Sequence, residues 1–198
     1  MSIQLITPEI ISQFLSRVEA EFGKPGTIYL IGETSLVVEG HRRYTDRVDF
    51  CSSVDAAERE KFNSAVRSVA EQMSLKITDE FPGEVIPLPE GYDDRSRELS
   101  AETSLSTEGF TVLHFDPYSV SYRFIARGSE PDYHVVLKFL EHDWMEETEV
   151  TDRLEKLLPE FSFDTIQQDP AEFRRRMGGL WQMWNARKAK ILSQEAVS

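Results

Sequence analysis

Apolar residues recur at helical spacing near the start of the chain. Thr7 followed by Pro8 and Glu9 is typical of a helix start, because a hydroxyl side chain caps free N–H groups and proline fits the first helical turn. The positions that follow place their apolar side chains on one face of a helix: Ile10, Ile11, Phe14, Leu15, Val18 and Phe22. This pattern predicts an amphipathic helix that ends at Gly23.

The period of the apolar pattern then switches between that of a strand and that of a helix. Short runs rich in β-branched and aromatic residues predict strands at 27–31, 48–51, 75–77, 85–88 and 110–115. Longer runs with an apolar residue every three or four positions predict helices at 34–39, 55–73, 118–127, 132–141 and 148–158, and a long one after Asp169, with Glu172 placed for a capping box. The polar stretch 93–106 predicts an exposed loop that Leu99 and Leu105 pin to the core.

This order of elements predicts an α/β (α+β) fold. A small mixed β-sheet with flanking helices is expected over residues 1–116, followed by a helical C-terminal region over 117–198 that packs on it. A chain of 198 residues is long enough to bury a substantial apolar core.

The charge of the chain limits its partners. Its 35 acidic and 22 basic residues give a formal net charge of -13, which repels polyanions and argues against non-specific binding of nucleic acid. The basic residues of the last helix predict either a solvated face or a contact with RNA, a nucleotide or an acidic partner. They are Arg174, Arg175, Arg176, Arg187, Lys188 and Lys190. Trp181 and Trp184 on that helix are expected in the core or in a homodimer interface.

Other features predict a cytoplasmic protein with no membrane contact. The single cysteine, Cys51, forms no intramolecular disulfide and is expected to be a small buried apolar residue. No cationic leader opens the chain, and no apolar stretch approaches the roughly 20 residues that span a bilayer. His114 and His134 lack a partner at metal-ligand spacing and are predicted to be surface residues.

The segment 28–50, IYLIGETSLVVEGHRRYTDRVDF, carries the candidate chemistry. A predicted strand ends at Gly32, a turn containing Thr34 and Ser35 opens a short helix, and the next strand brings Asp49 back beside that turn. Backbone N–H groups and hydroxyls at a helix start hold phosphates. Carboxylates on a neighbouring strand hold magnesium, which takes hard oxygen ligands.

This segment resembles the signature of the nucleotidyltransferase superfamily, the DNA polymerase β-like fold. In that signature a Gly-Gly or Gly-Ser turn precedes a strand that reads acidic-apolar-acidic. The match places Gly32 on the first glycine, Gly40 on the glycine after the helix, Arg43 and Thr45 on their counterparts, and Asp49 on the second carboxylate. The chain is most similar to an uncharacterised prokaryotic branch related to toxin-antitoxin nucleotidyltransferases.

The resemblance implies a set of site residues and a cofactor. Asp49 and Asp46 are the implied catalytic and magnesium-binding carboxylates, and Asp79 or Glu80 is the third carboxylate. The implied nucleotide-binding residues are Gly32, Thr34, Ser35, Arg43 and Arg47.

Two positions depart from the signature. Glu33 replaces the second glycine or serine and puts an anion where phosphate approaches, and Arg47 replaces the first carboxylate. Because side chains alternate along a strand, Arg47 and Asp49 share a face, whereas Asp46 joins them only through a bulge. We therefore expect an Arg47–Asp49 salt bridge at the position of the magnesium.

Two functions follow from these residues. In one, the protein uses Mg²⁺ to transfer a nucleoside monophosphate from a nucleoside triphosphate to an RNA or protein hydroxyl. In the other, it is a catalytically inactive binding or regulatory module that acts through a protein partner. The departures at Glu33 and Arg47 favour reduced or lost activity.

Overall fold

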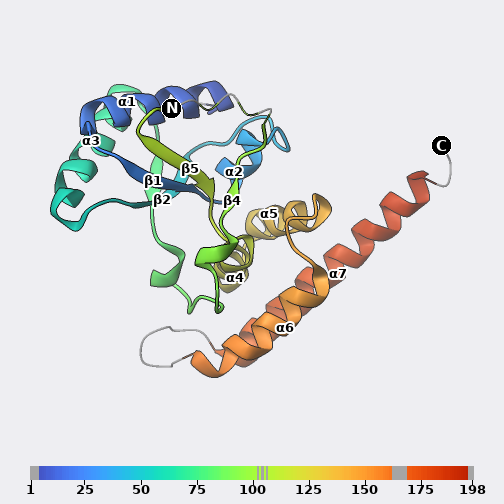
Figure 1. The fold of residues 1–198 in the computed structure, drawn as a ribbon. Helices are drawn as coiled ribbons and strands as arrows, with labels where there is room; N and C mark the ends of the chain where they lie inside the picture. The colour runs from blue at the N-terminus through green and yellow to red at the C-terminus, as the bar shows by residue number, and fades with distance from the viewer. Residues whose placement is uncertain (1–4, 102, 104, 106, 162–168, 196–198) are drawn as a thin grey trace. The chain divides into compact units, whose positions relative to one another are not determined.

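The computed structural model describes residues 5–101, 103, 105, 107–161 and 169–195 (Figure 1). Positions 102, 104 and 106 of the predicted loop, and 162–168 and 196–198 of the predicted C-terminal region, lie outside the described residues. The predicted fold class is confirmed, because the described residues form one mixed five-stranded sheet with flanking helices and a helical C-terminal part.

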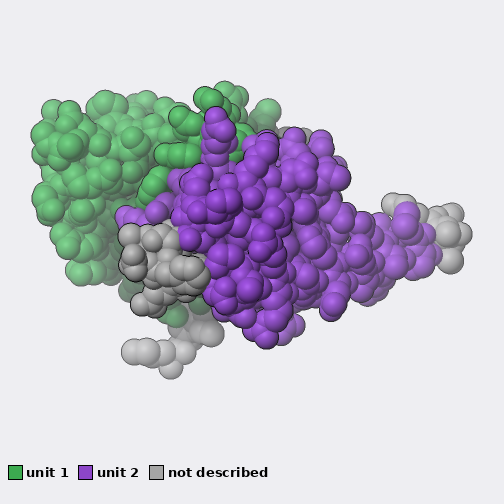
Figure 2. Space-filling model, turned by 90° about the horizontal axis from the view of Figure 1, so that it is seen from below, with its two compact units in different colours: residues 1–81, 91–116 green, residues 82–90, 117–198 purple. Residues whose placement is uncertain are grey.

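The chain divides into two compact units (Figure 2). Unit 1 comprises residues 1–81 and 91–116, and unit 2 comprises residues 82–90 and 117–198. The sequence-based prediction also sets a domain boundary after residue 116, but it assigns residues 82–90 to the sheet region, whereas the structure groups them with unit 2.

Unit 1 contains the sheet. Its strands among the described residues are β1 (Gly26–Leu30), β2 (Val48–Ser53), β3 (Ile77–Asp79), β4 (Arg97–Glu98) and β5 (Phe110–His114). They lie in the order β3-β2-β1-β5-β4. β1 pairs antiparallel with β2 and parallel with β5, so the end of β1, the start of β2 and the end of β5 meet at one edge of the sheet.

Helices cover one face of this sheet. α1 (Pro8–Phe22) and α3 (Arg59–Gln72) lie side by side on it, and the short α2 (Glu33–Val38) connects β1 to β2 (Figure 1). Ile28 and Phe50 belong to the buried cluster under these helices. Because side chains alternate along a strand, Tyr29, Asp49 and Cys51 lie on the opposite face of the sheet.

The region after α3 differs from the sequence expectation. The predicted strand at 85–88 is wrong: these residues form a turn and irregular backbone directly after a 3₁₀ helix, η2 (Pro82–Glu84). The prolines at 82, 87 and 89 lack the N–H that a strand ladder needs, which explains the difference. The predicted loop at 93–106 contains a short helix, η3 (Asp93–Arg95), as well as β4, and Leu99 and Leu105 pack against the core as expected.

Unit 2 is helical. It contains α4 (Pro117–Arg127), α5 (Glu130–Glu141), α6 (Glu147–Leu157), η4 (Leu158–Glu160) and α7 (Pro170–Glu195), and α4 packs against α5 and α7. Asp169 caps α7 by accepting a hydrogen bond from the Ala171 N–H at 2.9 Å. The carboxylate of Glu172 binds Arg175 and Arg176. Within the described part of the chain, no helix combines the length and apolar character needed to cross a membrane.

Candidate functional site

Gly32 forms the sharp turn between β1 and α2. Its φ of 60° and ψ of -123° lie in a region that glycine alone adopts at low cost. The Thr34 N–H donates to the Ile31 carbonyl at 3.2 Å, which closes a turn of the type that needs glycine at its second position. The backbone conformation of this turn therefore requires glycine at position 32.

The two hydroxyl residues of the turn point into the protein. Thr34 and Ser35 are buried on α2, which has six residues. The Thr34 hydroxyl accepts a hydrogen bond from the Asp49 backbone N–H at 2.7 Å. This bond ties α2 to the start of β2, so the Thr34 oxygen holds two elements of the fold together.

The side chain of Glu33 contacts two residues of the loop between α2 and β2. Its carboxylate accepts a hydrogen bond from the Thr45 hydroxyl at 2.9 Å and pairs with the Arg42 guanidinium at 2.9 Å. Arg43, the neighbouring candidate for nucleotide binding, is exposed. The anion that departs from the signature is therefore neutralised within the protein.

Arg47 and Asp49 form the salt bridge that the sequence predicts. Arg47 Nε lies 3.4 Å from Asp49 Oδ1, and the Arg47 and Asp49 side chains are 47% and 17% exposed. The prediction is confirmed. A guanidinium thus contacts the carboxylate that the resemblance implies as a magnesium ligand.

The other implied carboxylates lie apart from Asp49. Asp46 is half exposed and is 4.0 Å from the Lys76 ammonium. Asp79 is the register partner of Phe50, so it lies on the helix-covered face of the sheet, whereas Thr78 lies beside Asp49. Glu80 follows the last residue of β3 and donates its N–H to the Phe50 carbonyl at 3.1 Å.

The implied metal ligands are not gathered around Asp49 in the described residues. Magnesium takes oxygen ligands in near-octahedral geometry, and its sites usually combine one or two carboxylates with waters and substrate phosphates. Among the residues that the structure describes, no three His, Cys, Asp or Glu side chains come together as a candidate metal site. The assignment of Asp49, Asp46 and Asp79 as metal ligands stays a prediction.

A cavity of about 260 Å³ lies farther along the same face of the sheet. Its lining includes Cys51, two residues beyond Asp49 on β2, and Tyr29, the register partner of Cys51 on β1. Phe81, Tyr92 and Phe115 add three more aromatic rings. We call this the sheet-face cavity; its lining residues are spread from Tyr29 to Phe115, so no local sequence pattern predicts it.

Burial and local charge act on Tyr29 in this cavity. Burial raises the pKa of the Tyr29 hydroxyl, and the neighbouring Cys51, Tyr92 and Asp93 raise it further because they disfavour a phenolate. Tyr29 therefore remains a protonated hydroxyl, able to donate a hydrogen bond, at neutral pH.

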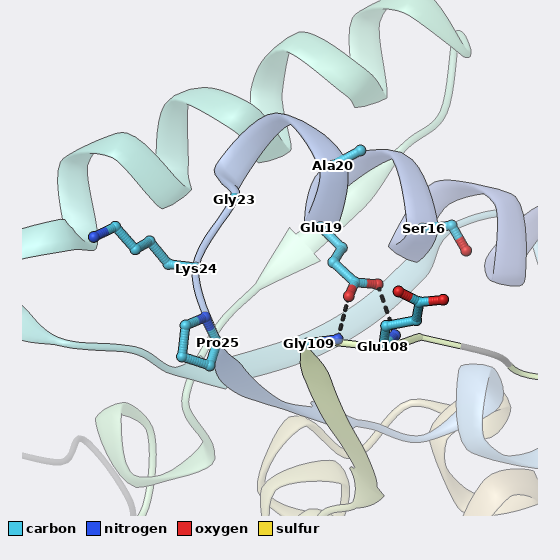
Figure 3. A pocket seen from close by; sticks show the side chains of 8 residues that line it. All are labelled: Ser16, Glu19, Ala20, Gly23, Lys24, Pro25, Glu108 and Gly109. Atoms are coloured by element: carbon cyan, nitrogen blue, oxygen red, sulfur yellow. Dashed lines mark hydrogen bonds between the residues drawn. The ribbon is translucent and has the colours of Figure 1, made fainter.

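A larger hollow of about 640 Å³ lies between the end of α1 and the turn before β5 (Figure 3). The Glu19 carboxylate points into it and accepts hydrogen bonds from the backbone N–H of Glu108, at 3.3 Å, and of Gly109. Two adjacent N–H groups would suit an anionic ligand, but Glu19 already binds both. Glu19 therefore acts as a cap for this turn.

His114 differs from the sequence expectation. It is 2% exposed rather than on the surface, and its Nε2 lies 2.7 Å from Glu39 Oε1. Burial raises the pKa of Glu39, but hydrogen bonds from His114 and Ser100 outweigh burial and lower it to about 2. The pair joins the end of α2 to β5. His134 is exposed, as predicted.

Most basic residues of α7 pair with acidic side chains of unit 2. Arg174 pairs with Glu155, Arg175 and Arg176 pair with Glu172, Arg187 pairs with Glu141, and Lys188 pairs with Glu147. Trp184 is buried, as expected, and its indole N–H donates to Glu147 at 2.9 Å. These ion pairs neutralise much of the positive charge, and an RNA contact through α7 stays a prediction.

Comparison with known proteins adds no relative. No family model, no curated protein and no solved structure matches this chain. Evidence for function therefore comes from the motif around Gly32 and Asp49 and from the geometry of unit 1.

Proposed function

We propose that this protein is a nucleotidyltransferase-like binding module in which an ion pair replaces the magnesium site. The observation that carries the proposal is the 3.4 Å contact between Arg47 Nε and Asp49 Oδ1. Metal-assisted nucleotidyl transfer needs a cluster of anionic oxygens around the ion. A guanidinium in that cluster repels a divalent cation and supplies the positive charge that Asp49 would otherwise receive from the metal.

The state of the turn residues supports the same proposal. Thr34 uses its hydroxyl oxygen to accept from the Asp49 backbone, and Glu33 is paired with Arg42. A triphosphate approaching this turn meets the Glu33 carboxylate and two buried hydroxyl side chains. These contacts stabilise the turn without offering a phosphate cradle, so we infer recognition without group transfer, with a small molecule or a protein as partner.

One observation favours the rival function, an active nucleotidyltransferase that uses Mg²⁺. The Gly32 turn and Asp49 are adjacent, as that chemistry requires, because the Ile31 N–H donates to the Asp49 carbonyl at 3.0 Å. An exposed Arg47 side chain that moved away would leave Asp49 accessible to a metal. The two functions differ in whether nucleotide binding depends on magnesium.

Thermal melting with each of the four nucleoside triphosphates, with and without Mg²⁺, tests the proposal. We expect no magnesium-dependent shift for the natural protein. Arg47→Asp restores the acidic-apolar-acidic strand and should create such a shift, up to about 2.7 kcal/mol at a ligand concentration a hundredfold above the dissociation constant. Arg67→Asp, the same charge change on the exposed face of α3, is the matched control and should create none.

The opposite outcome supports the enzyme. A magnesium-dependent shift in the natural protein with one nucleotide, lost in Asp49→Asn, would show that the ion pair opens to admit the metal. An assay for release of pyrophosphate in the presence of RNA or protein acceptors would then identify the reaction.

A further inference from the structure

A short antiparallel ladder joins the segment before α1 to the loop between α2 and β2. The Ile6 N–H donates to the Thr45 carbonyl at 2.8 Å, and the Thr45 N–H donates to the Ile6 carbonyl at 3.0 Å. Both side chains are buried. Because side chains alternate along paired segments, their chain neighbours Leu5 and Tyr44 point outward, and they are 50% and 45% exposed. The ladder therefore presents an apolar side chain and an aromatic ring on its outer side.

Leu5 and Tyr44 lie close enough to contact the same partner. In this ladder Leu5 is opposite Asp46 and diagonal to Tyr44. Diagonal neighbours of this kind are about 7–8 Å apart, within reach of an aromatic side chain. Most large apolar side chains of the described residues are buried, and single exposed ones are ordinary, but two on one short ladder form a patch.

Arg43 supplies an uncompensated positive charge beside this patch. The two nearest basic residues have acidic partners: Arg42 pairs with Glu33 at 2.9 Å. Lys76 lies 4.0 Å from Asp46. Arg43 is exposed, and no described residue forms an ion pair or hydrogen bond with its side chain. Because both neighbouring pairs are neutral, Arg43 leaves one excess positive charge here, in a chain whose formal net charge is -13.

The backbone holds Arg43 and Tyr44 in place. The Arg42 N–H donates to the Leu36 carbonyl at 3.1 Å, and the Arg42 Nε donates to the Tyr44 carbonyl at 2.9 Å. Thr45, the next residue, is fixed by the ladder. A surface whose backbone is already ordered loses less conformational entropy when a partner binds, so more of the contact energy contributes to affinity.

These features suit a protein partner better than a nucleic acid. Arginine and tyrosine are enriched among the side chains that dominate protein–protein binding. Nucleic acids are held through several phosphate contacts, and one unpaired guanidinium in a chain of net charge -13 supplies too little positive charge for them. A peptide segment needs only one carboxylate at Arg43, because a guanidinium binds a carboxylate through two hydrogen bonds.

We infer that Leu5, Arg43 and Tyr44 form a docking surface, here called the ladder surface, for an acidic segment of a partner protein that carries an apolar side chain beside its carboxylate. The carboxylate would pair with Arg43, and the apolar side chain would pack on Leu5 and Tyr44. This inference rests on the proposed function, since it names the partner class of the binding module. It requires neither Asp49 nor magnesium.

Selection of short random peptides from a displayed library on the immobilised full chain tests the inference. The selected peptides should be enriched in aspartate or glutamate together with leucine, phenylalanine or tyrosine. Fluorescence anisotropy of labelled synthetic copies then measures their dissociation constants. Arg43→Glu should weaken binding by about tenfold or more, because like charges then face each other, and Tyr44→Ala should weaken it by about fivefold or more.

Three variants serve as controls. Tyr44→Phe keeps the ring and should retain binding. Arg67→Glu makes the same charge change at an exposed position of α3, and Leu192→Ala removes an exposed apolar side chain of α7. Both should bind the peptides as the natural protein does. The melting temperature of each variant is measured first, to show that it is folded.

Three results would overturn the inference: no peptide is enriched, the enriched peptides lack acidic residues, or either Arg43→Glu or Tyr44→Ala leaves peptide binding unchanged. Binding of single-stranded poly(U) RNA that is lost in Arg43→Glu, with no peptide enriched, would assign the surface to nucleic acid instead. These failures are distinct from failure of the proposed function. That proposal fails if nucleotide binding requires magnesium and is lost in Asp49→Asn, whatever the substitutions on the ladder surface do.

Discussion

The guanidinium of Arg95 binds the carboxylate of Asp116 through two hydrogen bonds, from Nε to Oδ1 and from Nη2 to Oδ2, both 3.0 Å long. Asp116 is fully buried just after β5, and Arg95 ends η3. The pair therefore fastens the segment that carries Tyr92 to the sheet edge that carries Phe115. Bidentate pairs of this kind add geometric specificity as well as energy.

Asp116→Ala should destabilise unit 1 strongly. It leaves the Arg95 guanidinium, whose side chain is only 19% exposed, without its carboxylate partner, and breaking a buried pair in this way costs about 3–5 kcal/mol. Urea denaturation followed by circular dichroism measures the loss. Lys24→Gln removes one partner of an exposed pair with Glu58, and its effect should stay within about 1 kcal/mol. Equal effects of the two substitutions would contradict a structural role for the buried pair.

The Glu39–His114 pair should make stability depend on acidic pH. The folded state lowers the pKa of Glu39 from 4.5 to about 2, so Glu39 contributes stability that is fully present above pH 4.5. This contribution is lost as the pH falls from 4.5 towards 2, because the carboxylate must then take up a proton. Glu39→Gln should flatten the dependence of unfolding free energy on pH within that window.

Denaturation series at several pH values between 2 and 6 measure this slope. Glu21→Gln, at an exposed position of α1, is the control and should retain the slope of the natural protein. An unchanged slope in Glu39→Gln would show that another carboxylate is responsible.

Gly32→Ala should destabilise the protein by about 1–3 kcal/mol, because a Cβ atom makes the backbone at φ 60° and ψ -123° strained. Gly178→Ala is a control for which we expect the opposite change in stability. Gly178 lies inside α7 with open space around its Cα, so alanine there should stabilise by about 0.4–1 kcal/mol. Thermal melting of both variants compares them, and a neutral Gly32→Ala would mean that the turn relaxes to another conformation.

Much of unit 1 is predictable from local sequence. Three predicted features depend only on residues that are close together in the chain, and the structure agrees with each. They are the helical spacing around Phe14 and Phe22, the β-branched run before Gly32, and the alternation that places Arg47 and Asp49 on one face. Where proline removed backbone donors, at 85–88, an apolar run resembled a strand but did not form one. The apolar pattern of a segment does not show whether its backbone N–H and C=O groups can pair with a neighbouring strand.

The sequence by itself determined the α/β class, the turn at Gly32 and the pairing of Arg47 with Asp49, because these depend on the period of side chains along one segment. Only the tertiary structure decided that Asp79 lies on the face opposite to Asp49, that His114 is buried against Glu39, and that distant aromatic residues line one cavity. Those outcomes depend on which strands pair and in what register. Long-range packing sets the register, and a shift of one residue turns every side chain of a strand to the other face.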